Sequence, residues 1–157
     1  MKVLSLLQPW ASLVVTGAKH IETRSWNTKY RGPLLIHASK KYNNEHKELG
    51  VRFTLKYGLL LRESNALPVG QIIGSVNLIE TFPTELVCSG SGAIGFKSNL
   101  RVADGNQLKM VQITKKEEAF GDYSPGRYGW LLSNPIQFKT GIPTKGSLGL
   151  WEYNGPL

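Results

Sequence analysis

The sequence predicts a mixed α+β fold, in which about five to six strands form a small mixed β-barrel flanked by a few helices. Three observations lead to this class. Several short segments carry the alternating or β-branched pattern of strands, whereas only a few stretches carry helical features. Glycines stand inside or beside these segments, where the strands of a closed or nearly closed barrel have to bend. The length of 157 residues suits one domain.

The clearest elements lie at the start of the chain. Residues 2–7 are apolar enough for a first strand, which ends before Pro9. Proline has a fixed φ and no backbone N–H, so it favours the first position of a helix, and residues 10–16 are predicted to form that helix. Gly17 can adopt the left-handed conformation that commonly ends a helix. The chain is therefore expected to pass directly into a strand over residues 17–26.

The middle of the chain is predicted to add two strands and helical structure. Residues 34–38 form an apolar run that is typical of a buried strand. Residues 42–62 carry capping residues and apolar spacing that fit either one helix or two shorter ones. A long strand is expected over residues 70–82, with Gly74 as the place of a bulge or of a close approach.

Residues 83–126 are rich in Gly and Ser and then in alternating Lys and Glu, which predicts a long loop or insertion. The strand pattern resumes at residues 127–138, with a turn expected at Asn134 and Pro135, and a last strand is expected within residues 148–153. Residues 1–157 are thus interpreted as a single domain with a long loop or insertion around residues 83–126.

Charge and cysteine content indicate the partners and the compartment. Lys and Arg total 19 against 11 acidic residues, a net charge of +8, which favours anionic partners such as nucleic acid. The single cysteine, Cys88, excludes an intrachain disulfide and fits a cytoplasmic location. No apolar run approaches the length of a membrane span. The three histidines and Cys88 lack the spacing of metal ligands, so neither a metal site nor a cofactor is predicted.

The strand predicted over residues 17–26 carries an unusual set of polar side chains. Side chains alternate between the two faces of a strand. One face therefore carries His20, Glu22, Arg24 and Trp26. If this face lines a cleft, Glu22 can orient Arg24 and Lys19, which leaves two cationic donors beside an aromatic ring. Such a cleft would suit an anionic ligand with a flat part. The alternative is an ordinary ion pair between Glu22 and Arg24, with Trp26 in the core.

Several stretches carry a family resemblance. They are Leu4-Ser5-Leu6-Leu7-Gln8-Pro9-Trp10-Ala11-Ser12-Leu13, then Gly17-x-Lys19-x-x-Glu22-x-Arg24-Ser25-Trp26, then Tyr30-Arg31-Gly32-Pro33-Leu34-Leu35-Ile36-His37-Ala38, with shorter matches at 70–76, 128–130 and 149–151. In these stretches the sequence resembles the ASCH family, which is named for its homology to a transcriptional cointegrator and is grouped with the PUA-like folds. The resemblance implies a mixed barrel flanked by helices, with a cleft beside the first helix.

The first functional hypothesis is a nucleic-acid-binding module. Basic side chains would contact phosphates, and aromatic rings would stack on an unpaired base. The candidate phosphate contacts are Lys19, Arg24, Arg31 and Lys40, and the candidate stacking residues are Trp26, Trp10 and Tyr30. The partner is RNA, another nucleic acid or a nucleotide-like small ligand, and the PUA-like resemblance favours RNA.

The second hypothesis is an enzyme in the same cleft. A related branch of the superfamily hydrolyses an acylated cytidine with a Lys, a Thr three residues later and a Glu from a later strand. Lys19 matches this Lys and Glu80 is a candidate for the distant acid, but Glu22 stands in place of the Thr and cannot be the same nucleophile. Glu22 could instead act as a base. Ribonuclease activity, proposed within the family, would use Lys19 and Arg24 to stabilise phosphoryl charge.

A third hypothesis follows from the cointegrator resemblance alone. It implies an interaction domain that is recruited to transcription or translation complexes. No sequence feature marks a surface for such a partner.

Overall fold

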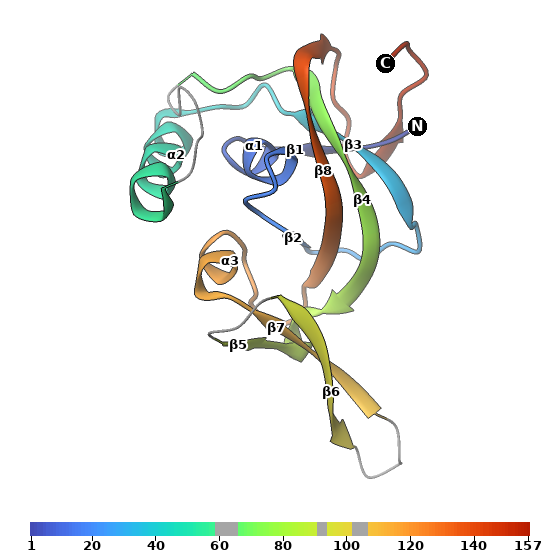
Figure 1. Cartoon of the computed structure of the whole chain (residues 1–157). Helices are drawn as coiled ribbons and strands as arrows, with labels where there is room; N and C mark the ends of the chain where they lie inside the picture. The colour runs from blue at the N-terminus through green and yellow to red at the C-terminus, as the bar shows by residue number, and fades with distance from the viewer. Residues whose placement is uncertain (59–65, 91–93, 102–106) are drawn as a thin grey trace. The chain divides into compact units, whose positions relative to one another are not determined.

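The computed structural model describes residues 1–58, 66–90, 94–101 and 107–157 (Figure 1). The helices are α1 (Trp10–Val15), α2 (Asn44–Tyr57), α3 (Lys115–Ala119) and the short 3-10 helix η1 (Thr84–Leu86). The strands are β1 (Lys2–Leu6), β2 (Ile21–Arg24), β3 (Gly32–Ala38), β4 (Gln71–Pro83), β5 (Val87–Ser89), β6 (Gly95–Arg101), β7 (Gln107–Ile113), β8 (Tyr128–Pro143) and β9 (Leu150–Glu152). One sheet has six strands in the order β2-β8-β4-β3-β1-β9, and the other has three in the order β5-β7-β6.

The predicted α+β class is confirmed. The six-stranded sheet is mixed, because β1 pairs with β3 in parallel and with β9 antiparallel. The chain divides into two compact units, the first consisting of Met1–His20, Tyr30–Ile79 and Leu132–Leu157 and the second of Ile21–Lys29 and Glu80–Leu131. In the first unit, the strands curl in the manner of half a barrel, as the curved paths of residues 71–79 of β4 and 132–143 of β8 show (Figure 1).

The core of the first unit forms around β3. Leu34, Leu35 and Ile36 are at most 1% exposed, so both faces of this strand are covered, as its unbroken apolar run predicts. The register between β3 and β4 shifts after Ile36, which pairs with Gly74. A Cβ atom at Gly74 would overlap the carbonyl oxygen of Ile136 and other neighbouring atoms. The expectation of a bulge or close approach at this glycine is confirmed.

The helices of the first unit begin and end where local signals place them. Five of the six α1 residues are buried, and Gly17 follows the helix with φ +79°, the left-handed conformation predicted for its end. Helix α2 begins after Asn43, whose side chain accepts a hydrogen bond from the backbone N–H of His46 at 2.9 Å. It is one continuous helix, and it ends at Gly58 with φ +61°. The end of the predicted 42–62 segment lies outside the described residues.

The stretch from residue 83 to 126 has its own secondary structure. Its described residues include η1, β5, β6, β7 and α3, so the expectation of a long loop is corrected. The reason lies in its apolar residues: Val111 and Ile113 are 1% exposed and pack with Ile21 and Phe82. These buried contacts hold together a segment whose Gly, Ser, Lys and Glu content suggested a loop.

The turn expected at Asn134 and Pro135 is also corrected. Strand β8 runs without interruption from Tyr128 to Pro143. Asn134 has φ +48°, which makes it the one non-glycine residue with positive φ in the described part of the chain. Asparagine tolerates this conformation better than most residues, so the backbone forms an irregularity inside the strand instead of reversing direction.

Candidate nucleic-acid interface

The candidate site lies in the second unit, on one face of β2 and β8. The two strands pair antiparallel, with Glu22 opposite Trp130 and Arg24 opposite Tyr128. Directly opposite residues lie on the same face of a sheet. Because Glu22 and Arg24 are two positions apart, they share this face, as the alternation of the sequence predicts.

Four side chains form what we call the arginine–tryptophan cluster: Glu22, Arg24, Trp26 and Trp130. Strand β2 ends at Arg24, earlier than the predicted residue 26, so Trp26 lies two residues beyond it. Nη1 of Arg24 lies 3.6 Å from Oε1 of Glu22. The guanidinium carbon of Arg24 lies 5.6 Å from the centre of the Trp26 ring, within the range of a cation–π interaction. Trp26 in turn packs edge-on against Trp130, with 4.7 Å between ring centres and 88° between planes. Each side chain of the cluster therefore restricts the position of the next one.

Burial decreases across the cluster from its base to its outer side. Trp130 is fully buried and the Glu22 side chain is 9% exposed, whereas the Arg24 side chain is 27% exposed and Trp26 is half-buried. A guanidinium group has five N–H donors in one plane, so a single carboxylate neighbour leaves donors for a further partner. The cluster can thus offer cationic donors beside an indole ring to a ligand that carries phosphate and a flat base.

The outer edge of β2 is covered by residues between α3 and the start of β8. The backbone N–H of Ile21 donates to Oε1 of Glu117 at 2.7 Å, and Glu117 is 1% exposed. On the same edge, Nη2 of Arg127 donates to the carbonyl oxygen of Thr23 at 3.3 Å, and the hydroxyl oxygen of Thr23 accepts from the N–H of Asp122 at 3.0 Å. These side chains replace a neighbouring strand, so β2 is held in place and does not present an open edge.

Two buried polar atoms of this unit have no hydrogen-bond partner in the described part of the chain, Nε1 of Trp130 and the hydroxyl of Tyr123. Burial, followed by the negative charges of Glu117 and Glu22, raises the pKa of Tyr123 far above its ordinary value. The phenol therefore stays protonated at neutral pH. Trp130, Tyr123 and Glu117 are not among the site residues predicted from the sequence, although the Thr-x-x-Glu pattern that ends at Glu117 is a recognisable helix-start signal.

Lys19, the predicted partner of Glu22 and Arg24, belongs to the first unit and is 1% exposed. Its backbone N–H donates to the carbonyl oxygen of Leu13 at 2.9 Å, which ties it to the end of α1. An anion outside the protein cannot contact the ammonium group in this position. For Lys19 to take its predicted roles in binding or catalysis, its side chain would have to move toward the surface, or the ligand would have to enter the protein interior.

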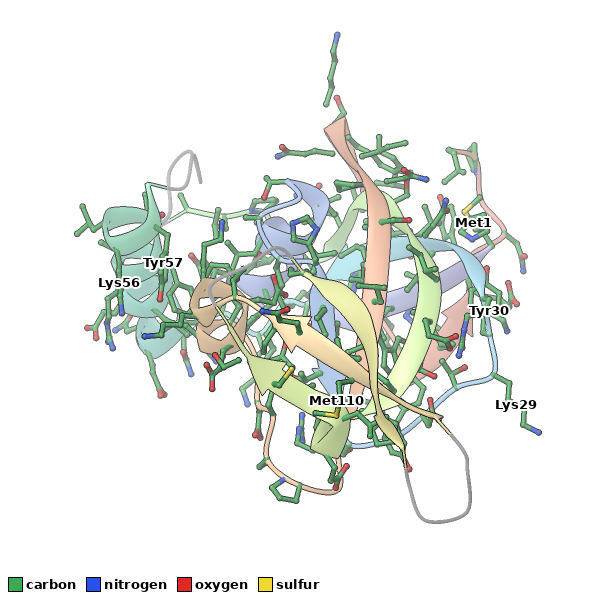
Figure 2. All side chains as sticks on the ribbon, turned by 60° about the horizontal axis from the view of Figure 1, so that its bottom comes forward. Met1, Lys29, Tyr30, Lys56, Tyr57 and Met110 are labelled. Atoms are coloured by element: carbon green, nitrogen blue, oxygen red, sulfur yellow. The ribbon has the colours of Figure 1, made fainter. Side chains whose placement is uncertain are left out.

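The other predicted aromatic contacts have their own neighbours in the first unit. Trp10 packs edge-on against His46, with 5.8 Å between ring centres. Tyr30 lies on the segment that follows Lys29 (Figure 2), and its hydroxyl donates to the carbonyl oxygen of Pro33. Both rings are half-buried, so each retains some exposed surface.

The remaining basic and acidic candidates lie at separate positions. Arg31 is exposed, and its Nη1 donates to the carbonyl oxygen of Tyr30 at 2.8 Å. Lys40 is exposed after β3, with its aliphatic stem over Gly70. Glu80, the candidate distant acid, accepts a hydrogen bond at 2.9 Å from the backbone N–H of Thr81. The contacts described here bring together Glu22, Arg24 and Trp26 of the predicted site.

Two other kinds of feature are absent from the described ranges. No group of three or more His, Cys, Asp or Glu side chains there could hold a metal ion. None of the helices described is both long enough and apolar enough to cross a membrane.

Comparison with known proteins identifies the family. The family model of the ASCH domain matches residues 4–140. The chain belongs to the ASCH domain family. ASCH domains have a PUA-like fold that is often linked to RNA binding. The resemblance read from the sequence is thereby confirmed.

Among curated proteins, the chain is similar to activating signal cointegrator 1 from Mus musculus and from Homo sapiens. Each is 28% identical over 156 residues, which cover 98% of this chain and 22% of the relative. The chain thus spans about a fifth of the length of these relatives.

Solved structures with some similarity include two mutant forms of the ASCH protein ZmASCH from Zymomonas mobilis. One is 17% identical with a TM-score of 0.45, and the match covers 90% of this chain and 72% of that chain. The other is 14% identical with a TM-score of 0.41, and the match covers 90% of this chain and 73% of that chain.

Proposed function

We propose that this ASCH domain binds single-stranded or structured RNA through the arginine–tryptophan cluster. The observation that carries the proposal is the position of Arg24, a partly exposed guanidinium held between a buried carboxylate and a half-buried indole. The net charge of +8 supports an anionic partner, and the family's association with nucleic acid supports the same class.

The chemistry of the cluster favours unpaired nucleotides. Arg24 donates to phosphate oxygens, while the ring of Trp26 offers a surface for a base. In a duplex the bases are stacked on one another, so an indole at the protein surface reaches them only in loops, bulges or single strands. Glu22 keeps the guanidinium oriented before the ligand arrives, which lowers the entropy lost on binding.

The proposal is tested with fluorescein-labelled single-stranded RNA, duplex RNA and single-stranded DNA, each titrated at two salt concentrations. Single-stranded RNA is expected to bind most tightly, and more weakly at higher salt because phosphate contacts release counterions. In Trp26→Ala the loss of one stacked base weakens binding by about 1–3 kcal/mol, or roughly 5- to 150-fold. Binding of equal strength to duplex and single strand, unchanged in this variant, would contradict the proposed stacking.

The labelled strands are then run on a denaturing gel, which separates binding from turnover. Intact strands are expected of a binding module. Strands that are cut by the wild-type protein and remain whole with Glu22→Gln would make the domain a ribonuclease instead.

Two other expectations belong to this proposal. Residues 1–157 are proposed to act as a single domain, with residues 83–126 as an insertion that supports β2 through Glu117 and Asp122. A cytoplasmic location is proposed because the single Cys88 is a free thiol, which suits a reducing compartment.

A further inference from the structure

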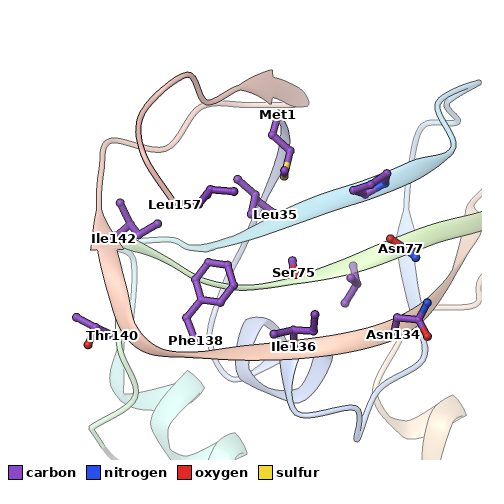
Figure 3. A pocket seen from close by; sticks show the side chains of 12 residues that line it. Met1, Leu35, Ser75, Asn77, Asn134, Ile136, Phe138, Thr140, Ile142 and Leu157 are labelled. Atoms are coloured by element: carbon purple, nitrogen blue, oxygen red, sulfur yellow. The ribbon is translucent and has the colours of Figure 1, made fainter.

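The first unit contains a pocket of about 550 Å³ that the RNA-binding proposal does not use (Figure 3). Strands β3, β4 and β8 form its floor, and the side chains of Met1 and Leu157 lie at its rim. Pockets for small molecules commonly enclose about 300–1,000 Å³. The size of this pocket therefore suits a small organic molecule.

The lining carries no charged side chain, although 30 of the 157 residues are charged. The apolar lining includes Leu35, Ile136, Phe138 and Ile142, and the polar lining consists of Ser75, Asn77, Asn134 and Thr140. The amino group of Met1 is turned to other partners, since it donates to the carbonyl oxygen of Tyr153 at 2.7 Å and lies 3.3 Å from the Glu152 carboxylate. A charged ligand would lose its hydration here without gaining an opposite charge.

The two asparagines of the lining lie at the same end of the pocket. Figure 3 shows Asn77 and Asn134 near one end, and Phe138 and Ile142 toward the other. The side-chain amides of the two asparagines form no hydrogen bond within the described part of the chain. Each amide can donate and accept, so the pair forms a hydrogen-bonding end beside an apolar compartment.

Asn134 also stands out in its backbone. Its φ of +48° is unusual for a residue other than glycine, and such conformations are concentrated at sites with a function. Its side chain faces the pocket together with those of Ile136, Phe138, Thr140 and Ile142, as the alternation of side chains along β8 requires. The unusual backbone conformation of Asn134 and the two side-chain amides are thus found at the same end of the pocket.

We propose that this pocket binds a small, uncharged aromatic amide. The aromatic body packs against Ile136, Phe138 and Ile142, and the amide exchanges hydrogen bonds with Asn77 and Asn134. The inference does not depend on RNA binding, because the lining includes no basic residue and no member of the arginine–tryptophan cluster.

The test uses three probes with the same apolar body: biphenyl-4-carboxamide, biphenyl-4-carboxylate and biphenyl. Each is titrated into isotope-labelled full-length protein while backbone amide shifts are followed by NMR. The carboxamide is expected to shift resonances of β3, β4 and β8 and to bind at least roughly tenfold more tightly than the carboxylate, because the site cannot neutralise a charge. Biphenyl should bind more weakly than the carboxamide, because it leaves both asparagines without a new partner.

Ile136→Asp is the decisive variant, because Ile136 is 56% exposed and the change should leave the fold intact. It introduces a charge into the pocket and is expected to weaken carboxamide binding by roughly tenfold or more. Leu55→Asp is the matched control: Leu55 is 80% exposed, lies on α2 and does not line the pocket, so binding should not change.

Several results would overturn the inference. These are the absence of saturable shifts, equal affinity for carboxamide and carboxylate, or the same response in Ile136→Asp as in Leu55→Asp. A dimer in sedimentation experiments that dissociates in Ile136→Asp would also overturn it, because a second copy of the chain would then cover this face. RNA binding by Ile136→Asp is measured in parallel and is expected to equal that of the wild type.

Discussion

The substitution Gly129→Ala tests how the second unit supports the arginine–tryptophan cluster. Gly129 lies in β8 between Tyr128 and Trp130 and is opposite Thr23 of β2. A Cβ atom here would overlap the Cε2 and Cζ atoms of Phe82 and lie 3.2 Å from Cγ2 of Ile21. Phe82 is 4% exposed, so its ring is enclosed by other protein atoms.

The expected cost follows from this overlap. Adding a methyl group to a packed core without room costs about 1–3 kcal/mol, which for a domain of this size lowers the melting temperature by roughly 2–12 °C. Phe82→Leu removes the overlapping ring atoms but leaves a cavity, so alone it is also destabilising. In the double variant the methyl group partly fills that cavity. Its cost should be smaller than the sum of the two single costs by about 0.5–3 kcal/mol.

Thermal and urea unfolding of the four proteins, followed by circular dichroism, measure this cycle. Gly95→Ala in β6 is the matched control, since a Cβ atom there has no neighbour within 4 Å and its stability should not fall. A melting temperature of Gly129→Ala equal to that of the wild type would refute the packing argument. Strictly additive costs in the double variant would show that Phe82 is not the residue in conflict.

Two further predictions concern the first unit. Asn43→Ala removes the side-chain acceptor for the backbone N–H of His46 and should lower the free energy of unfolding by about 1 kcal/mol, measured by thermal unfolding. Asn44→Ala, one position into the helix, is the control and should cost much less. Equal losses in the two variants would contradict the capping role of Asn43. Burial lowers the pKa of His37 below 6.5, partly opposed by its hydrogen bond to Thr144, so the folded state favours the neutral ring. Its contribution to stability is therefore full above pH 6.5 and is lost as the pH falls through the folded-state pKa. Urea unfolding at two pH values on either side of 6.5 should show this loss in the wild type and a weaker one in His37→Gln; equal pH dependence in both proteins would contradict it.

Local signals made much of the fold predictable. Pro9 and Gly17 bracket α1, and the apolar run of β3 shows that both faces of that strand are buried. The face of β2 could be read because side-chain alternation depends only on neighbouring residues. Glu22 and Arg24 therefore came out as a pair from the sequence.

What depends on distant residues could not be read in this way. Trp130 joins the cluster through a strand pairing more than 100 positions along the chain from Glu22, and no local pattern fixes that register. The burial of Lys19 was missed because a lysine is rarely buried and its charge suggested the surface. Val111 and Ile113 anchor the insertion, but the polar residues around them concealed the strands.

The most direct test of the central claim compares Arg24→Ala with Arg52→Ala in RNA titrations at two salt concentrations. Both variants lose one positive charge, but Arg52 is an exposed residue of α2, outside the cluster. If RNA binds at the cluster, Arg24→Ala weakens binding of single-stranded RNA by roughly tenfold or more and reduces the salt dependence by about one phosphate contact, while Arg52→Ala changes both little. Equal effects of the two substitutions would show that RNA responds to net charge alone, and would contradict a binding site at the arginine–tryptophan cluster.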